Sequence, residues 1–421
     1  MSRIVFHVDV NSAFLSWSAV HRVMNLGEKI DLRDVPSIVG GDQESRHGIV
    51  LAKSIPAKKY KIQTGEPIVD AKRKCPQLTI IPPDYSLYVK ASRAFIKKLQ
   101  EYCDQVIQYS IDEAWCNFIG YDSLYGKHQM IAFATQLKDE IKRELGFTVN
   151  IGVSTNYLLA KMAGDFSKPD KVHTLFPDEI ERKMWPLPVE DLFYVGPATT
   201  RKLHSLGITT IGQLATADES LIKAHLKKMG LIVQGYAKGH DLQPFMYESP
   251  ANKGYGNSMT APRDVTSMEF AKLLLLSLCE TVGARIREDG VKIRTVSIHI
   301  TTYEFQHSST QMQLIAPTDI TEEIYAAACK LLDVLWDKVT PLRQLGVHTS
   351  KVETETARQY NLFDLYQFER LETINHMVDD IRERFGEQAL IRASFLQNYN
   401  VSTMSGGLDK ERRGGFTRTS I

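Results

Sequence analysis

Cysteine is scarce in this chain, and its distribution excludes a disulfide scaffold. The 421 residues hold only five cysteines, an odd number, and none forms a C-x-x-C pair. They are Cys75, Cys103, Cys116, Cys279 and Cys329. Such a scattered set argues against structural disulfides and structural zinc and is typical of a reducing compartment. We therefore expect a cytoplasmic protein.

Long apolar runs are also missing. No stretch approaches the roughly 20 apolar residues of a membrane span, and the first residues, Met1 to Phe6, lead straight into a predicted strand without room for a signal peptide. Hydrophobic residues make up 43% and charged residues 24% of the chain, which is typical of soluble globular proteins. A chain of 421 residues should form about two to four domains.

A large net charge is the third absence. The 51 basic and 50 acidic side chains leave a net charge of +1, so nothing global indicates binding to nucleic acid. Locally, the segment from Ser45 to Gly65 holds five basic residues and no acidic one. A solvated lysine-rich face is the commoner explanation of such a run, and a phosphate-facing surface is the more specific one.

The strongest chemical signal lies in residues 106–118, where polar and apolar positions alternate as in a β-hairpin. Two adjacent carboxylates, Asp112 and Glu113, stand in its middle with apolar residues on both sides. Burial of an unpaired carboxylate is costly. The pair is therefore either an acidic turn or a site where a divalent cation compensates the charges.

The elements around this hairpin follow the order of a split βαββαβ unit. Strands are predicted over 3–10 and 147–154, helices over 85–103 and 127–145, and a large insertion follows the first strand. In that topology the first strand and the hairpin are neighbours, so Asp9 should face the two hairpin carboxylates. Three such groups would resist ionisation unless cations neutralise them.

The second half of the chain has a different sequence pattern. Short helical pieces come first, and residues 192–203 indicate two short helices around a glycine turn. A linker is expected over 242–256, followed by a second βαββαβ-like order. Its predicted helices and strands are 270–288, 292–305, 309–315, 320–336 and 342–352. A helix over 368–385 and a Gly- and Arg-rich end from Ser405, expected to be disordered, complete the chain.

Three motifs in this order resemble those of Y-family translesion DNA polymerases. They are residues 6–14 (Phe-His-Val-Asp-Val-Asn-Ser-Ala-Phe), residues 109–114 (Tyr-Ser-Ile-Asp-Glu-Ala) and residues 151–161 (Ile-Gly-Val-Ser-x-Asn-x3-Ala-Lys). Within that family the chain is similar to the bacterial DNA polymerase IV (DinB) and UmuC-type branches. The resemblance covers about residues 3 to 395.

The resemblance implies an α+β multidomain protein. Its parts would be a ferredoxin-like palm, a small fingers insertion, a helical thumb containing a helix-hairpin-helix, and a C-terminal βαββαβ little finger. The implied boundaries are palm 1–12 and 78–167, fingers 13–77, thumb 168–241, linker 242–254, little finger 255–353 and C-terminal tail 354–421.

The resemblance also implies DNA-templated nucleotidyl transfer of low fidelity, which serves translesion synthesis and takes a dNTP and primer–template DNA as substrates. Two Mg²⁺ ions would be held by the catalytic carboxylates Asp9, Asp112 and Glu113 and by the backbone carbonyl of Val10. One ion would lower the pKa of the primer 3′-hydroxyl and the other would clamp the triphosphate. Asp112 would bridge both ions, and Glu113 would support the first.

Three further residues match dNTP-binding positions of the family. Phe14 would lie under the sugar and exclude a 2′-hydroxyl, whereas Lys58 and Lys161 would bind the triphosphate. As ordinary residues they would be a core aromatic and two solvent-exposed lysines. Ile55 departs from the pattern, because many relatives have a phosphate-binding tyrosine there. Lys58 also replaces an arginine and lacks its bidentate fork.

Contacts with DNA are implied at Gly196, where the thumb hairpin keeps one of two family glycines and Tyr194 replaces the other. Lys292, Arg294 and His299 on a predicted little-finger strand are further candidates, although ordinary strand exposure is the commoner explanation.

The tail contains Gln-Tyr-Asn-Leu-Phe at residues 359–363, which is similar to the peptide by which bacterial polymerases dock on the sliding clamp. Its anchors would be Gln359, Leu362 and Phe363. We expect a monomer with no membrane partner.

Two other functions stay open at this point. The chain could be a DNA-bound accessory protein with an inactive palm, although such a palm has no need for three repelling carboxylates. It could also be a two-metal nucleotidyl cyclase. Residues 40–44 (Gly-Gly-Asp-Gln-Glu) are similar to the signature of cyclic-dinucleotide synthases, but they lie in the fingers insertion and are interpreted as a turn.

Overall fold

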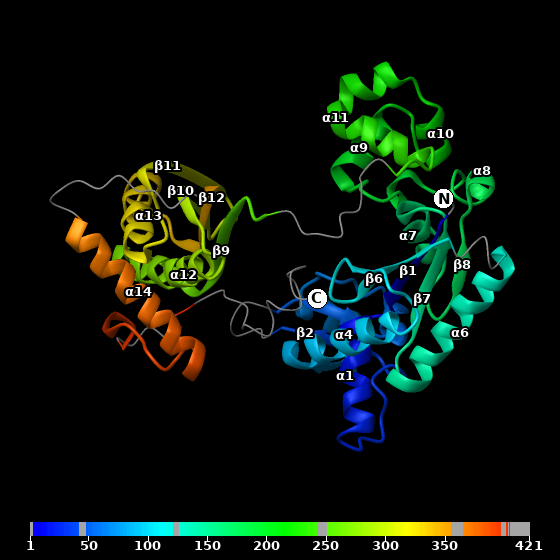
Figure 1. Cartoon of the computed structure of the whole chain (residues 1–421), viewed down its shortest axis with the longest axis horizontal. Coiled ribbons are helices and arrows are strands. Elements are labelled where there is room, and N and C mark those ends of the chain that lie inside the picture. Colours follow the sequence, from blue (N-terminus) through cyan, green and yellow to red (C-terminus); the bar gives the residue numbers. More distant parts are fainter. Residues whose placement is uncertain are drawn as a thin grey trace. The chain divides into compact units, whose positions relative to one another are not determined.

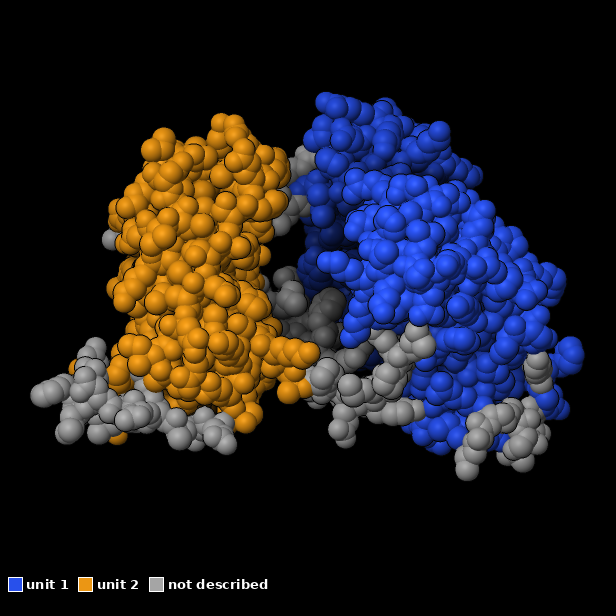
Figure 2. Space-filling model, turned by 90° about the horizontal axis from the view of Figure 1, so that it is seen from above, with its two compact units in different colours: residues 1–43, 47–249, 410–421 blue, residues 44–46, 250–409 orange. Residues whose placement is uncertain are grey.

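The computed structural model describes residues 3–41, 48–120, 126–241, 251–354, 365–396, 401–402 and 404. The chain divides into two compact units, and the division falls between residues 249 and 250 (Figures 1 and 2). We call them unit 1, whose described residues precede this boundary, and unit 2, whose described residues follow it. Among the residues that the structure describes, no helix is long and apolar enough to cross a membrane.

Unit 1 is built on a five-stranded sheet with β1 (Arg3–Val10) at its centre. Antiparallel neighbours flank β1 on both sides, namely β6 (Glu113–Ile119) and β7 (Val149–Ser154). The edges are β5 (Val106–Gln108) and β8 (Val172–Thr174), and the order is β5-β6-β1-β7-β8. The first strand and the hairpin are neighbours, as the split βαββαβ order predicts, and β8 is an addition parallel to β7.

One face of this sheet is covered by two long helices, because alternate residues of a strand point to opposite sides. Phe6 and Val8 of β1 belong to a buried cluster that also contains the apolar stripes of α4 (Tyr85–Gln100) and α6 (Lys127–Leu145). The predicted helix over 127–145 has these same bounds.

The other face packs against α7 (Tyr157–Asp165). Val5 of β1 and Trp115 of β6 lie in the buried cluster on this side, and the Trp115 indole donates a 3.2 Å hydrogen bond to the first carbonyl of α7. Asp9 and Glu113 follow the same alternation as Val5 and Trp115. Both therefore belong to the face that α7 covers.

The close approach of α7 to the sheet depends on Gly152 in β7. A Cβ atom at this position would lie 1.9 Å from the carbonyl oxygen of Ala160 and 2.4 Å from the backbone nitrogen of Gly164. Both atoms belong to α7, so any side chain at residue 152 would push the helix away from the sheet.

The insertion after β1 forms a small sheet of its own, in the order β3-β2-β4. Its elements are α1 (Ala13–Met24), β2 (Ser37–Gly40), β3 (Val50–Lys53), α2 (Ile55–Lys58), α3 (Ile68–Lys74) and β4 (Thr79–Ile81). The Gly-Gly-Asp-Gln-Glu run begins at the end of β2, and its residues from 42 onward lie outside the described part.

The last part of unit 1 is helical, with its own buried cluster. Its elements are η1 (Pro177–Glu179), α8 (Ile180–Lys183), η2 (Val189–Asp191), α9 (Pro197–Ser205), α10 (Ile211–Thr216) and α11 (Glu219–Ala237). Of the two short helices predicted within residues 192–203, only α9 overlaps that range, with Gly196 immediately before it, because the preceding short helix η2 already ends at Asp191.

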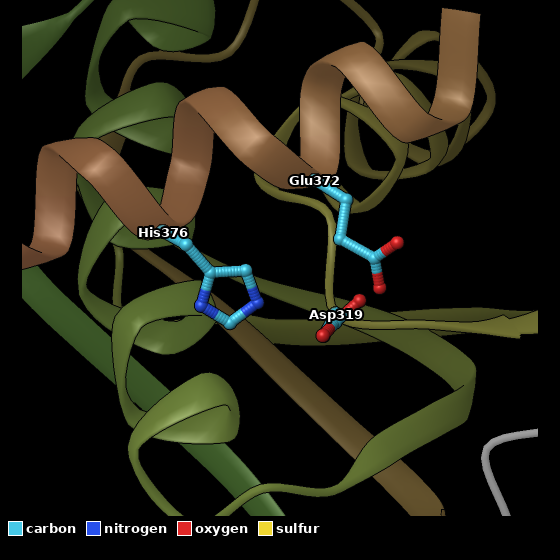
Figure 3. Close-up of side chains that lie close together, drawn as sticks. All are labelled: Asp319, Glu372 and His376. Carbon is cyan, nitrogen blue, oxygen red and sulfur yellow. The ribbon is translucent and has the colours of Figure 1, made fainter. Parts of the chain in front are cut away.

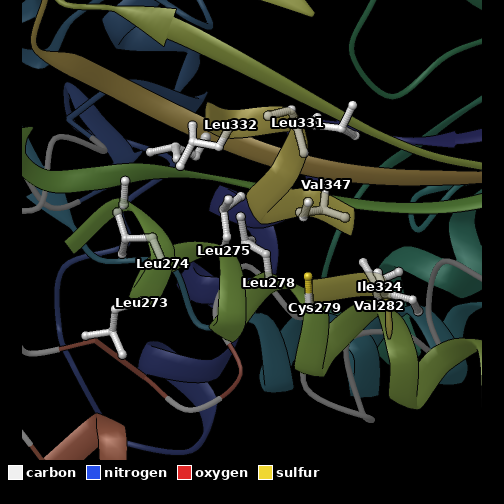
Figure 4. Packing of buried hydrophobic residues seen from close by; sticks show 14 of the residues in the cluster. Leu273, Leu274, Leu275, Leu278, Cys279, Val282, Ile324, Leu331, Leu332 and Val347 are labelled. Carbon is white, nitrogen blue, oxygen red and sulfur yellow. The ribbon is translucent and has the colours of Figure 1, made fainter. Parts of the chain in front are cut away.

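Unit 2 repeats the chain order βαββαβ, as predicted, but its strands are arranged differently. Its elements are β9 (Gly254–Val265), α12 (Met268–Glu288), β10 (Lys292–Thr302), β11 (His307–Thr318), α13 (Thr321–Leu335) and β12 (Leu342–Glu353). The sheet order is β11-β10-β12-β9, so the last strand lies between the first two. Figure 4 shows leucines of α12, such as Leu274 and Leu278, packing with Ile324 and Leu332 of α13 over Val347 of β12.

The residue range of the first strand of unit 2 was not predicted. β9 begins at Gly254, within the segment expected to be a linker, and pairs with β12 over its length. Glycine is needed at its start, because a Cβ on Gly254 would lie 2.2 Å from the carbonyl oxygen of Thr349. A Cβ on Gly256 would meet the His348 ring at 2.7 Å.

Beyond β12 the structure describes α14 (Leu365–Phe385) and η3 (Ala393–Leu396). The first of these confirms the helix predicted over 368–385. The clamp-like peptide at residues 359–363 and the tail from Ser405, expected to be disordered, lie outside the described residues.

Candidate active site

The predicted catalytic carboxylates meet at one end of the unit 1 sheet. Asp9, near the end of β1, is the register partner of Glu113, the first residue of β6. Asp112 comes just before β6, and its carbonyl accepts a 3.0 Å hydrogen bond from the backbone N–H of Val10. After β1 the chain turns at Ser12, which has a left-handed backbone conformation (φ 48°, ψ 53°) and directly precedes α1. Strand pairing thus joins three acidic residues from two distant segments.

Asp9 is buried, and a lysine compensates its charge. Only 8% of the residue is exposed, and its Oδ2 atom lies 2.6 Å from the ammonium of Lys168. Burial raises the pKa of Asp9 to about 6 against the attraction of Lys168, and the charges of Glu113 and Asp112 add to the rise. The surroundings of Asp9 therefore favour an additional cation.

Asp112 is half-buried and accepts a 2.7 Å hydrogen bond from the hydroxyl of Ser110. Burial raises the pKa of Asp112, and the charge of Glu113 adds to that rise, whereas the hydrogen bond from Ser110 opposes it. Additional positive charge nearby would stabilise its ionised form, as it would that of Asp9.

Glu113 has the opposite electrostatic environment. Its Oε2 atom lies 2.7 Å from the ammonium of Lys161 on α7 and 3.4 Å from Nε2 of His7. Burial alone would raise the pKa of Glu113, but His7 and Lys161 together lower it to about 2, so the carboxylate stays ionised. Burial also lowers the pKa of His7, which keeps its imidazole neutral at pH 7.

A cavity of about 840 Å³ opens beside this carboxylate cluster. Six positions singled out in the sequence line it: Asp9, Val10, Phe14, Ile55, Lys58 and Asp112. Lys168 lines it as well, whereas Glu113 and Lys161 are not among the lining residues. Residues from β1, the insertion and the segment after α7 thus surround a single space.

Phe14 forms part of the cavity wall and is held by other aromatic rings. Its ring stacks on Tyr88 with centroids 4.4 Å apart and an interplanar angle of 8°, and it meets Tyr85 edge-on at 6.0 Å. Ile55, at the start of α2, is 47% exposed, and its side chain has no hydrogen-bonding atom to offer the cavity. Lys58, also exposed, supplies a positive charge one turn further on.

The donors at this end of the cavity fit hard divalent cations. Asp9 and Asp112 supply carboxylate oxygens, and Val10, which also lines the cavity, has a carbonyl that could serve as a further ligand. Oxygen ligands suit Mg²⁺, which retains several waters. The raised pKa values of both aspartates mean that a divalent ion would stabilise their ionised forms.

Lys168 is a charged site residue that sequence reasoning missed. It follows α7 in a Ser-Lys-Pro segment and joins Asp165 at 2.9 Å as well as Asp9. The available signal was a basic residue directly after the helix that carries Lys161.

Lys161, which was predicted to bind the triphosphate, faces a different group. Besides its ion pair with Glu113, its ammonium lies 5.5 Å from the ring centroid of Tyr109 and 5.4 Å from that of Phe193. These contacts hold it against the sheet, away from the cavity lining.

The predicted DNA-binding residues differ in accessibility. Gly196 is exposed at the start of α9, and its own chain neighbours and helix backbone aside, the described residues place no atom within 4 Å of the position of a Cβ there. Tyr194, in the place of a family glycine, adopts φ 71°, the left-handed region that glycine tolerates best. Arg294 pairs with Glu353 at 2.7 Å.

Lys292 is 9% exposed, and its ammonium lies 3.0 Å from Glu372. This burial argues against a contact between Lys292 and DNA. His299 is half-buried over Gly346, where a Cβ would lie 1.9 Å from its ring.

Comparison with known proteins gives consistent matches along the chain. A model of the impB/mucB/samB family matches residues 8–165, a model of that family's C-terminal domain matches residues 252–362, and an IMS family HHH motif matches residues 177–208.

Similar curated proteins match over nearly their whole lengths. A DNA polymerase IV of Clostridium acetobutylicum is 42% identical over 397 residues, which cover 94% of this chain and 99% of the relative. A DNA polymerase IV of Acetivibrio thermocellus is 38% identical over 407 residues, covering 96% of this chain and 100% of the relative. A DNA polymerase IV 2 of Bacillus subtilis is 34% identical over 402 residues, covering 94% and 95%.

Two solved structures share the fold. A Y-family DNA polymerase chimera superposes with a TM-score of 0.69 at 20% identity, covering 84% of this chain and 100% of that chain. DinB from Sulfolobus solfataricus gives a TM-score of 0.52 at 22% identity, covering 82% and 98%.

Proposed function

Because the chain belongs to the DNA polymerase IV family of Y-family polymerases, we propose that the carboxylate cluster of unit 1 is its nucleotidyl-transfer centre. The chain is a DNA-directed DNA polymerase of the translesion type, whose substrates are dNTPs and template DNA. The comparisons do not favour an inactive accessory protein or a nucleotidyl cyclase. The observation that carries the proposal is the pairing of Asp9 with Glu113, with Asp112 beside them at the cavity.

The domain boundaries follow from the same proposal. In unit 1 the predicted boundaries are palm 1–12 and 78–167, fingers 13–77 and thumb 168–241. Because β4 pairs with β2 of the insertion and β8 pairs with β7 of the main sheet, we assign β4 to the fingers and β8 to the palm and keep the rest. We assign residues 255–353 of unit 2 to the little finger, after a linker over 242–254 and before a tail over 354–421.

Family members use divalent metal, and we propose two Mg²⁺ ions at Asp9, Asp112 and Glu113, with the Val10 carbonyl as a further ligand. When bound, such ions lower the pKa of the primer 3′-hydroxyl and neutralise charge on the triphosphate. Asp9 and Asp112, both of raised pKa, supply the oxygens nearest to the cavity. Glu113 stays ionised through His7 and Lys161 and supports the primer side.

The two lysines have different roles in this proposal. Lys168 lines the cavity and can exchange the carboxylate of Asp9 for a phosphate oxygen. Lys161 fixes Glu113 and does not line the cavity. We therefore assign triphosphate binding to Lys168 and to Lys58, and we assign to Lys161 the orientation of Glu113.

Replacement of each lysine separates these roles. Lys168→Ala should raise the KM for dNTP by about 10- to 100-fold, the effect of losing one hydrogen bond to a charged group. Lys161→Ala should mainly lower kcat, because it acts on Glu113. Steady-state primer extension at varied dNTP concentration measures both parameters.

The control for these variants is Lys171→Ala, which removes an exposed lysine three residues after Lys168 and should change neither parameter. A raised KM in Lys161→Ala together with an unchanged KM in Lys168→Ala would contradict the assignment.

DNA contacts are proposed at Gly196, whose exposed position at the start of α9 offers backbone N–H groups to a phosphate. Arg294 could join them by exchanging Glu353 for a phosphate. Binding that rests on such contacts should weaken as salt concentration rises.

We also propose that residues 359–363 dock on a sliding clamp, with Gln359, Leu362 and Phe363 as anchors, and that the polymerase is a monomer. Deletion of these five residues should abolish clamp-stimulated DNA synthesis, because the apolar anchors are lost, and should spare synthesis without clamp. Primer extension with and without purified clamp measures the difference. Stimulation that survives the deletion would show that docking occurs elsewhere.

A further inference from the structure

We propose that unit 2 contains a second, separate site for a divalent transition-metal ion, formed by Asp319, Glu372 and His376 (Figure 3). One ligand atom from each of the three side chains lies within 4.8 Å of the other two. Glu372 and His376 are four residues apart on α14, so both leave the helix on one side. Figure 3 shows them directed toward Asp319, which precedes α13.

The backbone that carries these three residues is held firmly. The carbonyl of Asp319 accepts a 2.7 Å hydrogen bond from Arg287, and the same arginine forms an ion pair with Asp379 of α14 at 2.5 Å. Asn375, between the two α14 ligands, accepts a 3.2 Å hydrogen bond from the N–H of Thr321. Contacts of this kind fix ligand positions before a metal binds.

The burial of Asp319 is the observation that points to a ligand. The residue is only 7% exposed, and its Oδ1 atom has no hydrogen-bond partner. The ammonium of Lys292 lies 3.8 Å from that atom, which exceeds hydrogen-bonding distance. A buried carboxylate oxygen without a hydrogen bond is unfavourable, and coordination of a cation would satisfy it.

The local charge balance also favours a cation. The two carboxylates face one ammonium, because Lys292 lies 3.0 Å from Glu372 and 3.8 Å from Asp319. The two carboxylates therefore carry one negative charge more than this ammonium compensates. Lys292 thus competes with a metal ion without fully replacing it.

The ligand chemistry selects the class of ion. Carboxylate oxygens alone would suit Mg²⁺ or Ca²⁺, whereas an imidazole nitrogen favours Zn²⁺ and other transition-metal ions. One histidine and two carboxylates leave room for a water, as in a four-coordinate zinc site. A bound ion would join α14 to the loop before α13. We name Zn²⁺ as the probe.

The test is a Zn²⁺ titration of the metal-free, full-length protein by calorimetry, with Mg²⁺ in excess to occupy the carboxylates of unit 1. The wild-type protein should bind one Zn²⁺ more tightly than His376→Ala does. Loss of a direct ligand should cost more than the roughly 10- to 100-fold in affinity that loss of an outer partner costs. His376 is exposed, so its replacement should leave the fold intact.

Two further variants sharpen the result. Lys292→Met removes the competing ammonium and should strengthen Zn²⁺ binding by at least about 10-fold. His307→Ala, which removes another exposed histidine of unit 2, should leave binding unchanged. Zn²⁺ should also raise the melting temperature of the wild type and not that of His376→Ala. Equal Zn²⁺ affinity and stoichiometry in the wild type and His376→Ala would overturn the proposal.

Discussion

Asp112→Asn should reduce primer extension by about 1000-fold or more, because an amide cannot supply the negative charge that a divalent ion needs at this position. The substitution keeps the size of the side chain, and Asn can still accept the hydrogen bond from Ser110. Binding of primer–template DNA should persist, since DNA binding depends mainly on phosphate contacts elsewhere. Extension of a labelled primer and fluorescence anisotropy of labelled DNA measure the two properties separately.

The matched control is Asp104→Asn, which neutralises an exposed carboxylate just before β5 and should leave extension unchanged. Glu113→Gln should reduce primer extension as Asp112→Asn does. It should also weaken the interaction with Lys161, because the ion pair between the two side chains is lost. Wild-type extension by either active-site variant would refute the assignment of the metal ligands. Loss of DNA binding in parallel with extension would instead indicate a structural role.

The carboxylate cluster could be predicted from sequence because strand pairing determines it. In the split βαββαβ arrangement predicted for unit 1 the first strand lies beside the hairpin, and the antiparallel register then places Asp9 opposite Glu113. Both strands have strong β-branched and aromatic patterns, so their existence was easy to predict. The pairing follows from topology without knowledge of any side-chain contact.

The roles of Lys161 and Lys168 could not be predicted from topology in this way. Whether a lysine near the end of α7 faces a carboxylate or the cavity depends on how the helix lies on the sheet. Gly152 allows α7 to approach β7 directly, and in that position Lys161 reaches Glu113. Lys168 enters the cavity from the irregular segment after the helix, where no periodic pattern indicates direction.

In unit 2, too, local sequence patterns failed where tertiary contacts decide the structure. β9 contains glycine and proline at positions that disfavour a strand, and it forms because β12 offers a long pairing edge. Lys292 has the pattern of an exposed strand residue, but Glu372 of α14 covers its ammonium. The positions of α14 and its partners are set by tertiary contacts that no local pattern encodes.

Phe14→Ala should allow the enzyme to incorporate ribonucleotides. The Phe14 ring is stacked on Tyr88 with centroids 4.4 Å apart, so it cannot move aside without breaking this contact. It lines the cavity together with Asp9 and Lys168, where the sugar of a bound dNTP would lie between metal ligands and triphosphate. Removal of the ring opens space for a 2′-hydroxyl, and discrimination against ribonucleotides should fall by at least about 10-fold.

The measurement is the ratio of kcat/KM for a dNTP to that for the matching ribonucleotide, determined with one enzyme preparation. Truncation of a half-buried aromatic can also destabilise the fold, but the ratio cancels any loss of active enzyme. Phe14→Tyr retains the ring and should retain sugar selection, which makes it the matched control. An unchanged ratio in Phe14→Ala would mean that another part of the cavity excludes the 2′-hydroxyl.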